Sequence, residues 1–225
     1  MTGRECIVLF ARYPEKGKVK SRLAAHYGAA FALQLYDNFV TDTLDTLKGV
    51  GIPFMIAFDP PGKKDEIRRH FGSDNVYIPQ EGSDLGARMH HAFCQCFAEG
   101  FESVIIIGSD IPDLPSKILK EAFSSLGNYD AVMGPSRDGG YYLIGFKRDT
   151  FIPQVFENIP WGNSTVLEDT MEVFQLRRGT VHLLPKWRDI DTPDDLSALV
   201  ERNSHTPFAR SRTMIYITAR TDNND

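Results

Sequence analysis

Long apolar runs are missing from this sequence, and no stretch approaches the roughly 18 consecutive apolar residues that a membrane-spanning helix needs. An apolar segment that we expect to form a strand begins at Cys6, which leaves no room for a signal peptide before it. Cysteine is also scarce: Cys6, Cys94 and Cys96 make an odd set that fits a reducing compartment and no disulfide framework. We therefore expect a cytoplasmic protein without a membrane span.

An excess of positive charge is absent as well. The 25 Lys and Arg residues are outnumbered by 30 Asp and Glu residues, so the net charge of −5 argues against nucleic acid as a partner. The two commonest nucleotide-binding patterns, G-x-x-x-x-G-K-[ST] and G-x-G-x-x-G, are missing too. With 225 residues, of which 42% are hydrophobic, the chain can form one sizeable α/β domain or two small ones.

The strongest strand signal is a run of four apolar residues at 104–107. Because the run has no polar alternation, it predicts a strand buried on both faces near the centre of a parallel sheet. Asp110 follows at the carboxyl end of this strand, the edge where open α/β sheets bind ligands. A carboxylate there is costly unless it holds a metal ion or accepts hydrogen bonds. Alternatively, Asp110 only caps the loop or the helix expected over residues 117–126, although Ser116 already offers such a cap.

Four cations lie within seven residues just after the first expected strand, 6–10. They occupy a loop that contains Pro14 and Gly17 and leads into a helix with Ser21 as its expected N-cap. Such a loop is a good anion cradle, because backbone N–H groups and the helix dipole add to the side-chain charge. The alternative is a solvated basic loop. The cations are Lys16, Lys18, Lys20 and Arg22, and the apolar helix positions are Leu23, Tyr27, Phe31, Leu35 and Phe39.

Short apolar runs predict the other strands, and apolar residues spaced three or four apart predict the other helices. Asp138, Gly139 and Gly140 separate two expected strands and predict a hairpin. The glycines would also let a backbone come close to a ligand beside an acid. The expected strands cover residues 54–58, 76–79, 130–134, 141–146 and 181–184, and the expected helices cover 63–71, 85–97, 117–126 and 165–178.

The acids near residue 190 can be partly sorted by their distance from the last expected helix. Thr192 as N-cap, Pro193 at the first helical position and Asp195 at the third make a near capping box. Helix initiation therefore explains Asp194 and Asp195.

Asp189 and Asp191 precede this cap and are not explained by it. They are candidates to meet Asp110 around one divalent cation, which needs hard oxygen ligands.

The composition turns polar after Arg202. We expect a domain over residues 1–202 and a polar C-terminal tail over 203–225, with one short strand at 214–218.

Five motifs, in this order, resemble the GT-A superfamily, the nucleotide-diphospho-sugar transferase fold. More narrowly, they are similar to a largely uncharacterised bacterial and archaeal family of glycosyltransferases. The resemblance covers roughly residues 5–200 and implies a single-domain α/β fold with a mixed, mostly parallel sheet flanked by helices. The motifs are FARYPEKGKVKSRLA at residues 10–24, QEGSDLGARM at 80–89, IIIGSDIPDL at 105–114, GPSRDGGYYLIGF at 134–146 and DIDTPDDL at 189–196.

The resemblance also implies roles for particular residues. It implies a nucleotide over the first half of the sheet and Mg²⁺ or Mn²⁺ held by Asp110 and Asp191. Asp110 and Asp138 are the expected catalytic residues. The expected nucleotide and phosphate ligands are Arg12, Gly17, Lys18, Lys20, Arg22, Gln80, Gly82 and Asp84, and the expected sugar or acceptor contacts are Gly139, Gly140, Tyr141 and Trp161.

Two departures from the family bear on the reaction. Only Asp110 occupies the strand end, where many glycosyltransferases carry two acids, and Asp113 lies three positions further on. The basic loop also resembles that of phospholactate and molybdenum cofactor guanylyltransferases. We expect a metal-dependent glycosyltransferase that moves a sugar from a nucleoside-diphosphate sugar to a small-molecule or lipid-linked acceptor. The alternatives are a guanylyltransferase-like nucleotidyltransferase, which uses a nucleoside triphosphate and releases pyrophosphate, and a non-catalytic nucleotide-binding module.

Overall fold

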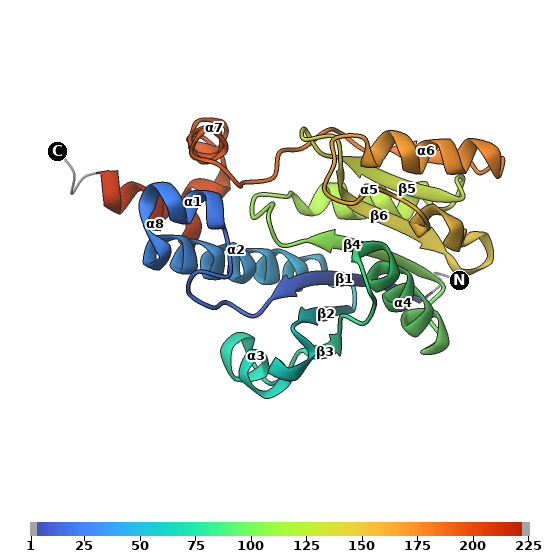
Figure 1. Ribbon diagram of the computed structural model, residues 1–225, viewed down its shortest axis with the longest axis horizontal. Helices are drawn as coiled ribbons and strands as arrows, with labels where there is room; N and C mark the ends of the chain where they lie inside the picture. Colours follow the sequence, from blue (N-terminus) through green and yellow to red (C-terminus); the bar gives the residue numbers. More distant parts are fainter. Residues whose placement is uncertain (1–3, 222–225) are drawn as a thin grey trace.

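Seven strands form one sheet in the computed structural model, which describes residues 4–221 (Figure 1). Their order across the sheet is β3-β2-β1-β4-β6-β5-β7. β6 runs antiparallel to both of its neighbours, and the other strands run parallel to one another. The predicted mixed, mostly parallel sheet is therefore confirmed. The strands are β1 Glu5–Arg12, β2 Phe54–Asp59, β3 Val76–Pro79, β4 Ser103–Gly108, β5 Ala131–Pro135, β6 Tyr141–Lys147 and β7 Val181–Leu183.

The apolar run at 104–107 forms the middle of β4, which is the central strand of the sheet. Its side chains are at most 4% exposed, since helices cover both faces. The predicted hairpin between β5 and β6 is also present, with antiparallel pairing. This topology puts the carboxyl ends of β1 and β4 next to each other.

Helices cover both faces of the sheet (Figure 1). One apolar core packs α2, α3 and α5 against it, and a second packs α4 and α6 against the opposite face. A third, smaller core joins α1, the first half of α2, α7 and α8. The helices are α1 Ser21–Tyr27, α2 Ala29–Val50, α3 Lys64–Phe71, α4 Leu85–Ala98, α5 Ser116–Ser125, α6 Val166–Leu176, α7 Pro193–Asn203 and α8 Arg212–Thr221, with short 3-10 turns η1 Pro61–Lys63, η2 Arg148–Thr150, η3 Pro153–Phe156 and η4 Pro207–Arg210. No helix among residues 4–221 is long and apolar enough to cross a membrane.

The helix expected after the basic loop is in fact two helices. Gly28 has φ +91° and separates α1 from α2, because this backbone conformation interrupts a right-handed helix. The N-cap position of α1 belongs to Lys20, with φ +48°, so the prediction of Ser21 as the cap was wrong.

The first residues of three other helices can be compared with the sequence-based predictions. The capping box of Thr192 and Asp195 at α7 is confirmed. Asp84 is the N-cap of α4 and accepts a hydrogen bond of 2.8 Å from the Ala87 N–H. Ser116 does not cap α5 but is its first residue, since the extended Pro115 occupies the cap position.

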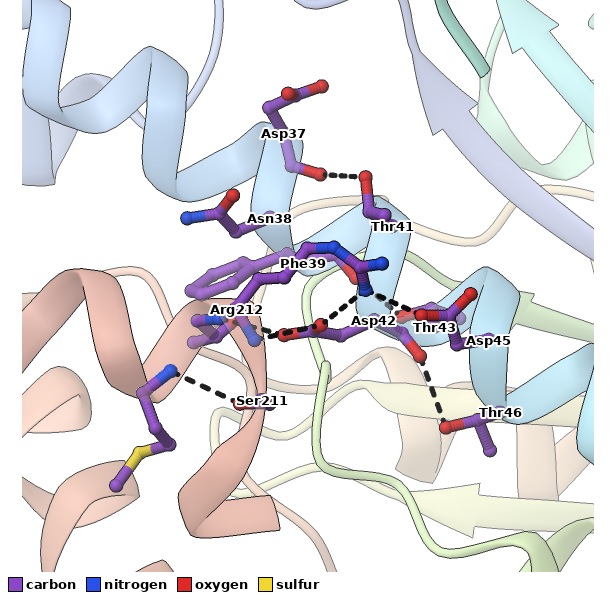
Figure 2. Close-up of polar contacts among 12 residues, drawn as sticks. Asp37, Asn38, Phe39, Thr41, Asp42, Thr43, Asp45, Thr46, Ser211 and Arg212 are labelled. Carbon is purple, nitrogen blue, oxygen red and sulfur yellow. Dashed lines mark hydrogen bonds and ion pairs between the residues drawn. The ribbon is translucent and has the colours of Figure 1, made fainter. Parts of the chain in front are cut away.

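The C-terminal segment forms η4 and α8, so the strand expected at 214–218 was wrong. Asp42 of α2 anchors the start of α8 by accepting hydrogen bonds from the Arg212 and Thr213 N–H groups, at 3.2 and 2.9 Å (Figure 2). The Arg212 guanidinium also contacts Asp45, at 2.5 Å. Met214 and Ile217 pack in the third core, so up to residue 221 the segment is not an extended tail. A domain boundary at residue 202 stays a prediction, and residues 222–225 of the expected tail lie outside the described residues.

Candidate functional site

A cavity of about 770 Å³ lies at the carboxyl ends of β1 and β4, with a mostly polar lining; we call it the central cavity. The basic loop, the start of α4 and the β5–β6 turn also contribute to its walls. It gathers eight of the residues for which the sequence predicted a role. They are Arg12, Lys20, Arg22, Gln80, Asp84, Asp110, Asp138 and Asp191.

Lys20 is buried in the wall of this cavity, with only 2% of its side chain exposed. Its ammonium nitrogen lies 2.5 Å from Oδ1 of Asp110 and 3.0 Å from Oδ1 of Asp191. The Phe39 ring lies beneath the ammonium, at 5.5 Å from the ring centroid. The left-handed backbone of Lys20 turns the chain from the basic loop into α1 at this point.

The charge of Lys20 is maintained by its two carboxylate partners. Burial alone would lower the pKa of Lys20, but attraction to Asp110 and Asp191, with a hydrogen bond to each, raises it. Lys20 is thus the counter-ion of the two acids that were expected to hold a metal. To contact a phosphate, the ammonium would either stay between the two carboxylates or move away from at least one of them.

Asp189 joins the same acidic cluster. Its pKa is raised to about 8 by burial and by the nearby charges of Asp110, Asp138 and Asp191. Oδ1 of Asp189 is buried, and it accepts no hydrogen bond from residues 4–221. The Ile190 N–H also donates to the Asp110 carbonyl at 2.9 Å, which ties the two acid-bearing segments together. The structure therefore brings Asp189 and Asp191 close to Asp110, and their role as metal ligands stays a prediction.

The donor set of this cluster suits a divalent metal ion. A buried carboxylate oxygen without a hydrogen-bond donor is the type of hard ligand that Mg²⁺ and Mn²⁺ bind. As the side chains stand, however, no three acidic, histidine or cysteine residues within 4–221 converge enough to hold a metal. The Lys20 ammonium lies between two of the acids, so a metal bound by both would compete with it.

Two residues that the sequence analysis missed brace the strand ends. The Tyr36 hydroxyl accepts a hydrogen bond from the Arg12 N–H at 2.7 Å and lies 3.2 Å from the Ser109 hydroxyl. Burial and the charge of Asp110 raise the pKa of Tyr36, so it stays protonated as a donor. Tyr36 is one position away from the apolar stripe used to predict the helix, and that pattern carried no signal for its contacts.

The side of the cavity next to β2 is held by an ion pair and an amide. Asp59 lies between Arg88, at 3.3 Å, and the exposed Arg12, at 3.9 Å. Gln80 donates to the Ala57 carbonyl at 2.8 Å, so its amide nitrogen already holds a strand end. Arg12 is the more available of these groups for an anionic ligand, since 65% of its side chain is exposed.

The β5–β6 turn is closed by Asp138. One of its oxygens accepts from the Gly140 N–H at 3.1 Å and from the Ser136 hydroxyl. Gly139 has φ +93°, and a side chain there would collide with the backbone of Ser164. These glycines therefore serve the turn and its packing, while Asp138 still borders the central cavity.

Seven predicted site residues do not line the central cavity. Gly17, with φ +82°, turns the exposed basic loop, and Lys18 is exposed beside it. Gly82 packs against the start of α4, where an added Cβ would lie 2.6 Å from the Arg88 nitrogen. Tyr141 and Trp161 pack edge to face, at 6.3 Å between ring centroids, and Trp161 lies against Gly86 of α4. The seven are Gly17, Lys18, Gly82, Gly139, Gly140, Tyr141 and Trp161.

The chain is similar to one family model and to several solved structures. A family model described as "Uncharacterized protein conserved in bacteria (DUF2064)" matches residues 43–163. A solved structure of a candidate nucleotide-diphospho-sugar transferase from Desulfovibrio desulfuricans G20 superimposes with a TM-score of 0.95 at 39% identity, over 98% of this chain and 96% of that one. The predicted resemblance to the nucleotide-diphospho-sugar transferase fold is thereby confirmed.

A relative named as a guanylyltransferase and a second solved structure also match the chain. The chain is 24% identical, over 184 residues, to a 2-phospho-L-lactate guanylyltransferase of Methanocaldococcus infernus, with 80% of this chain and 78% of that protein covered. The structure of a 4-diphosphocytidyl-2C-methyl-D-erythritol synthase from Anaerococcus prevotii has the same fold, with a TM-score of 0.58 at 14% identity over 90% of this chain and all of that one. Together these matches support an enzyme of the nucleotidyl or nucleotide-sugar transferase type.

Proposed function

This chain belongs to the family described as "Uncharacterized protein conserved in bacteria (DUF2064)", and we propose that its central cavity catalyses nucleotidyl transfer from a nucleoside triphosphate. The acceptor would be a small acid that carries a phosphate group, and pyrophosphate would be released. One observation carries the proposal: a buried lysine and a group of carboxylates meet at the strand ends. Such a site can bind both a triphosphate and its metal ion.

Glycosyl transfer, the first expectation from the sequence, has less support. It relied on a sugar pocket made by the β5–β6 glycines and Trp161. Trp161 instead packs against α4 and Tyr141, and Gly139 packs against the segment before α6. The similarity to guanylyltransferases extends over about four fifths of the chain and favours the nucleotidyl alternative.

The cations have separate tasks in this proposal. Arg22 lies on the exposed rim of the central cavity and would bind the terminal phosphates, which leave as pyrophosphate. Lys20, fixed beside Asp110, would hydrogen-bond the α-phosphate and stabilise the charge that develops on it. Arg12 would contact the nucleoside side, where the ends of β1 and β2 meet.

Asp110, Asp189 and Asp191 are the residues that would hold Mg²⁺ or Mn²⁺. When bound, such an ion supplies Lewis-acid stabilisation of phosphate charge. Asp189 fits this task because one of its oxygens is buried and has no other partner within residues 4–221. Lys20 would have to loosen its contact with at least one of these acids.

The proposed reaction is a single displacement, in which one bond to phosphorus forms and one breaks. A phosphate oxygen of the acceptor attacks the α-phosphorus, the bond from this phosphorus to the bridging oxygen breaks, and that oxygen leaves with pyrophosphate. A phosphate oxygen is already deprotonated near neutral pH, so no general base is needed. Asp138 keeps one oxygen free of the turn contacts and would orient the acceptor through its hydroxyl or carboxyl group.

The experiment is a pyrophosphate-release assay with Mg²⁺ or Mn²⁺, a panel of nucleoside triphosphates beginning with GTP, and phosphorylated acids beginning with 2-phospho-L-lactate. The proposal expects pyrophosphate release only when triphosphate and acceptor are both present, and loss of release in Asp110→Asn. Lys120→Ala, at an exposed position of α5 away from the cavity, is the matched control. Nucleotide binding without turnover for any acceptor would instead favour the non-catalytic module.

A further inference from the structure

A cavity larger than the central cavity lies elsewhere in the described chain. It measures about 1060 Å³, against 770 Å³ for the central cavity, and shares no lining residue with it. It lies between the loop after Asp110 and helices α2, α7 and α8, and its lining surface is mostly apolar. We call it the apolar cavity. Leu114, Pro115, Phe208 and Ile215 contribute to its walls.

Part of this apolar lining is exposed to solvent. Ile215 of α8 lines the apolar cavity with 59% of its surface exposed. Nearby polar groups are largely committed to one another: Arg212 is paired with Asp42 and Asp45, as Figure 2 shows. A large apolar recess walled by paired charges is typical of a site for a small apolar group.

A smaller groove of about 590 Å³ adjoins the apolar cavity, and Trp187 and Arg202 line both. Three more cations line this basic groove: Arg137, Lys186 and Arg188. Arg202 is neutralised by two hydrogen bonds to the buried Asp113, of 2.7 and 2.9 Å.

The remaining cations of the basic groove differ in their availability. Arg188 lies 3.6 Å from Asp195. Arg137 and Lys186 are exposed and form no ion pair with any residue of 4–221. Glu201 is the acidic member of the lining. Two uncommitted cations therefore lie at one end of an apolar recess.

The backbone explains why cations collect on this side. Ser136 and Trp187 pair as a parallel bridge, so the two segments that follow run side by side. Each continues with Arg and then Asp. Arg137 and Arg188 line the basic groove, whereas Asp138 lines the central cavity and Asp189 belongs to the acidic cluster.

We propose that the apolar cavity and the basic groove together bind a soluble single-chain amphiphile with an anionic head. The alkyl chain would occupy the apolar cavity, and a phosphate or carboxylate head would bind Arg137 and Lys186. The recess lies among helices, which favours a monomeric ligand over a membrane surface. This site does not depend on the reaction proposed for the central cavity.

The test is calorimetry on the full chain with decyl phosphate below its micelle concentration, next to decanol and inorganic phosphate. Decyl phosphate should bind at least tenfold more tightly than either, and each methylene added or removed should change its affinity about fourfold. Ile215→Glu and Arg137→Glu should each weaken binding at least tenfold. Lys120→Glu, outside both cavities, should leave it unchanged.

Three results would overturn the proposal: equal affinity for decyl phosphate and decanol, no effect of either variant in protein that still folds by circular dichroism, or binding to anionic vesicles but not to the monomer. Competition with GTP separates the sites. GTP should leave decyl phosphate bound, whereas displacement by GTP would place the amphiphile in the central cavity and contradict the assignment.

Discussion

The Lys20 ammonium lies 3.0 Å from Oδ1 of Asp191, 171 residues away in the chain, and 2.5 Å from Oδ1 of Asp110. One buried cation thus joins the basic loop to both acid-bearing segments. A divalent ion bound by the same carboxylates would compete with this ammonium, so metal binding and the position of Lys20 are coupled.

Lys20→Met tests this competition. Without the ammonium, the clustered acids repel one another, and the metal-free variant should lose roughly 1 to 3 kcal/mol of stability. The loss is moderate because Asp110 and Asp191 are partly exposed, so water screens their charges. Mn²⁺ should then raise the melting temperature of the variant more than that of the wild type, measured by scanning fluorimetry. Lys18→Met, at an exposed position, is the control. An equal Mn²⁺ effect on all three proteins would refute the competition.

Arg22→Ala should weaken a nucleoside triphosphate roughly tenfold to a hundredfold and leave the nucleoside nearly unaffected, since a charge-assisted hydrogen bond contributes about 1.5 to 3 kcal/mol. Calorimetry with GTP and guanosine measures both. Lys18→Ala is the matched comparison, because Lys18 was predicted from the sequence to hold phosphate but does not line the central cavity. A larger loss from Lys18 than from Arg22 would show that the loop rearranges around the nucleotide.

Asp189 should make the metal-free protein less stable as pH rises. Its pKa is raised from 3.8 to about 8 in the folded state, so between these values the folded protein binds more protons than the unfolded chain. The contribution of Asp189 to the free energy of unfolding is fully present below about pH 4 and is lost as the pH rises toward 8. Urea unfolding in EDTA should show Asp189→Asn more stable than wild type at pH 9, by roughly 1 to 3 kcal/mol, and similar at pH 4. Parallel pH curves for the two proteins would contradict this, and Asp194→Asn serves as the control.

Asp195→Ala should cost about 0.5 to 2 kcal/mol of stability through the lost capping box. The same carboxylate also accepts from the Asp191 N–H at 3.3 Å, so the substitution should weaken metal-dependent nucleotide binding as well. Chemical denaturation and calorimetry would measure the two effects. Asp194→Ala should stay within about 0.5 kcal/mol of wild type. Loss of stability with unchanged binding would mean that the cap does not position Asp191.

The strands and the acid cluster could be predicted because local patterns determine them. The apolar run at 104–107 identifies the central strand, and the connection rules of parallel sheets then bring Asp110 to the ligand-binding edge. Asp189 and Asp191 were singled out once the capping box had explained their neighbours. These inferences need only sequence spacing.

The rest depends on contacts between distant segments. Nothing local shows that Lys20 is turned inward by a left-handed backbone while Lys18 stays exposed. The helix α8 was missed because its burial depends on Asp42 and the third core. Trp161 was expected at a ligand pocket but packs against α4. The sequence around an aromatic loop residue does not show which helix it packs against.

Phosphorus NMR tests the central claim most directly, because it identifies which bond is broken. The protein would be kept in a buffer that contains Mg²⁺ and no Mn²⁺. It would be incubated with nucleoside triphosphates plus phosphorylated acids, and separately with nucleoside-diphosphate sugars plus the same acceptors. The account predicts pyrophosphate and a new diphosphate diester signal in the first set, absent in Asp110→Asn, and no change in the second. Nucleoside diphosphate released from a sugar nucleotide, with no pyrophosphate from any triphosphate, would contradict it.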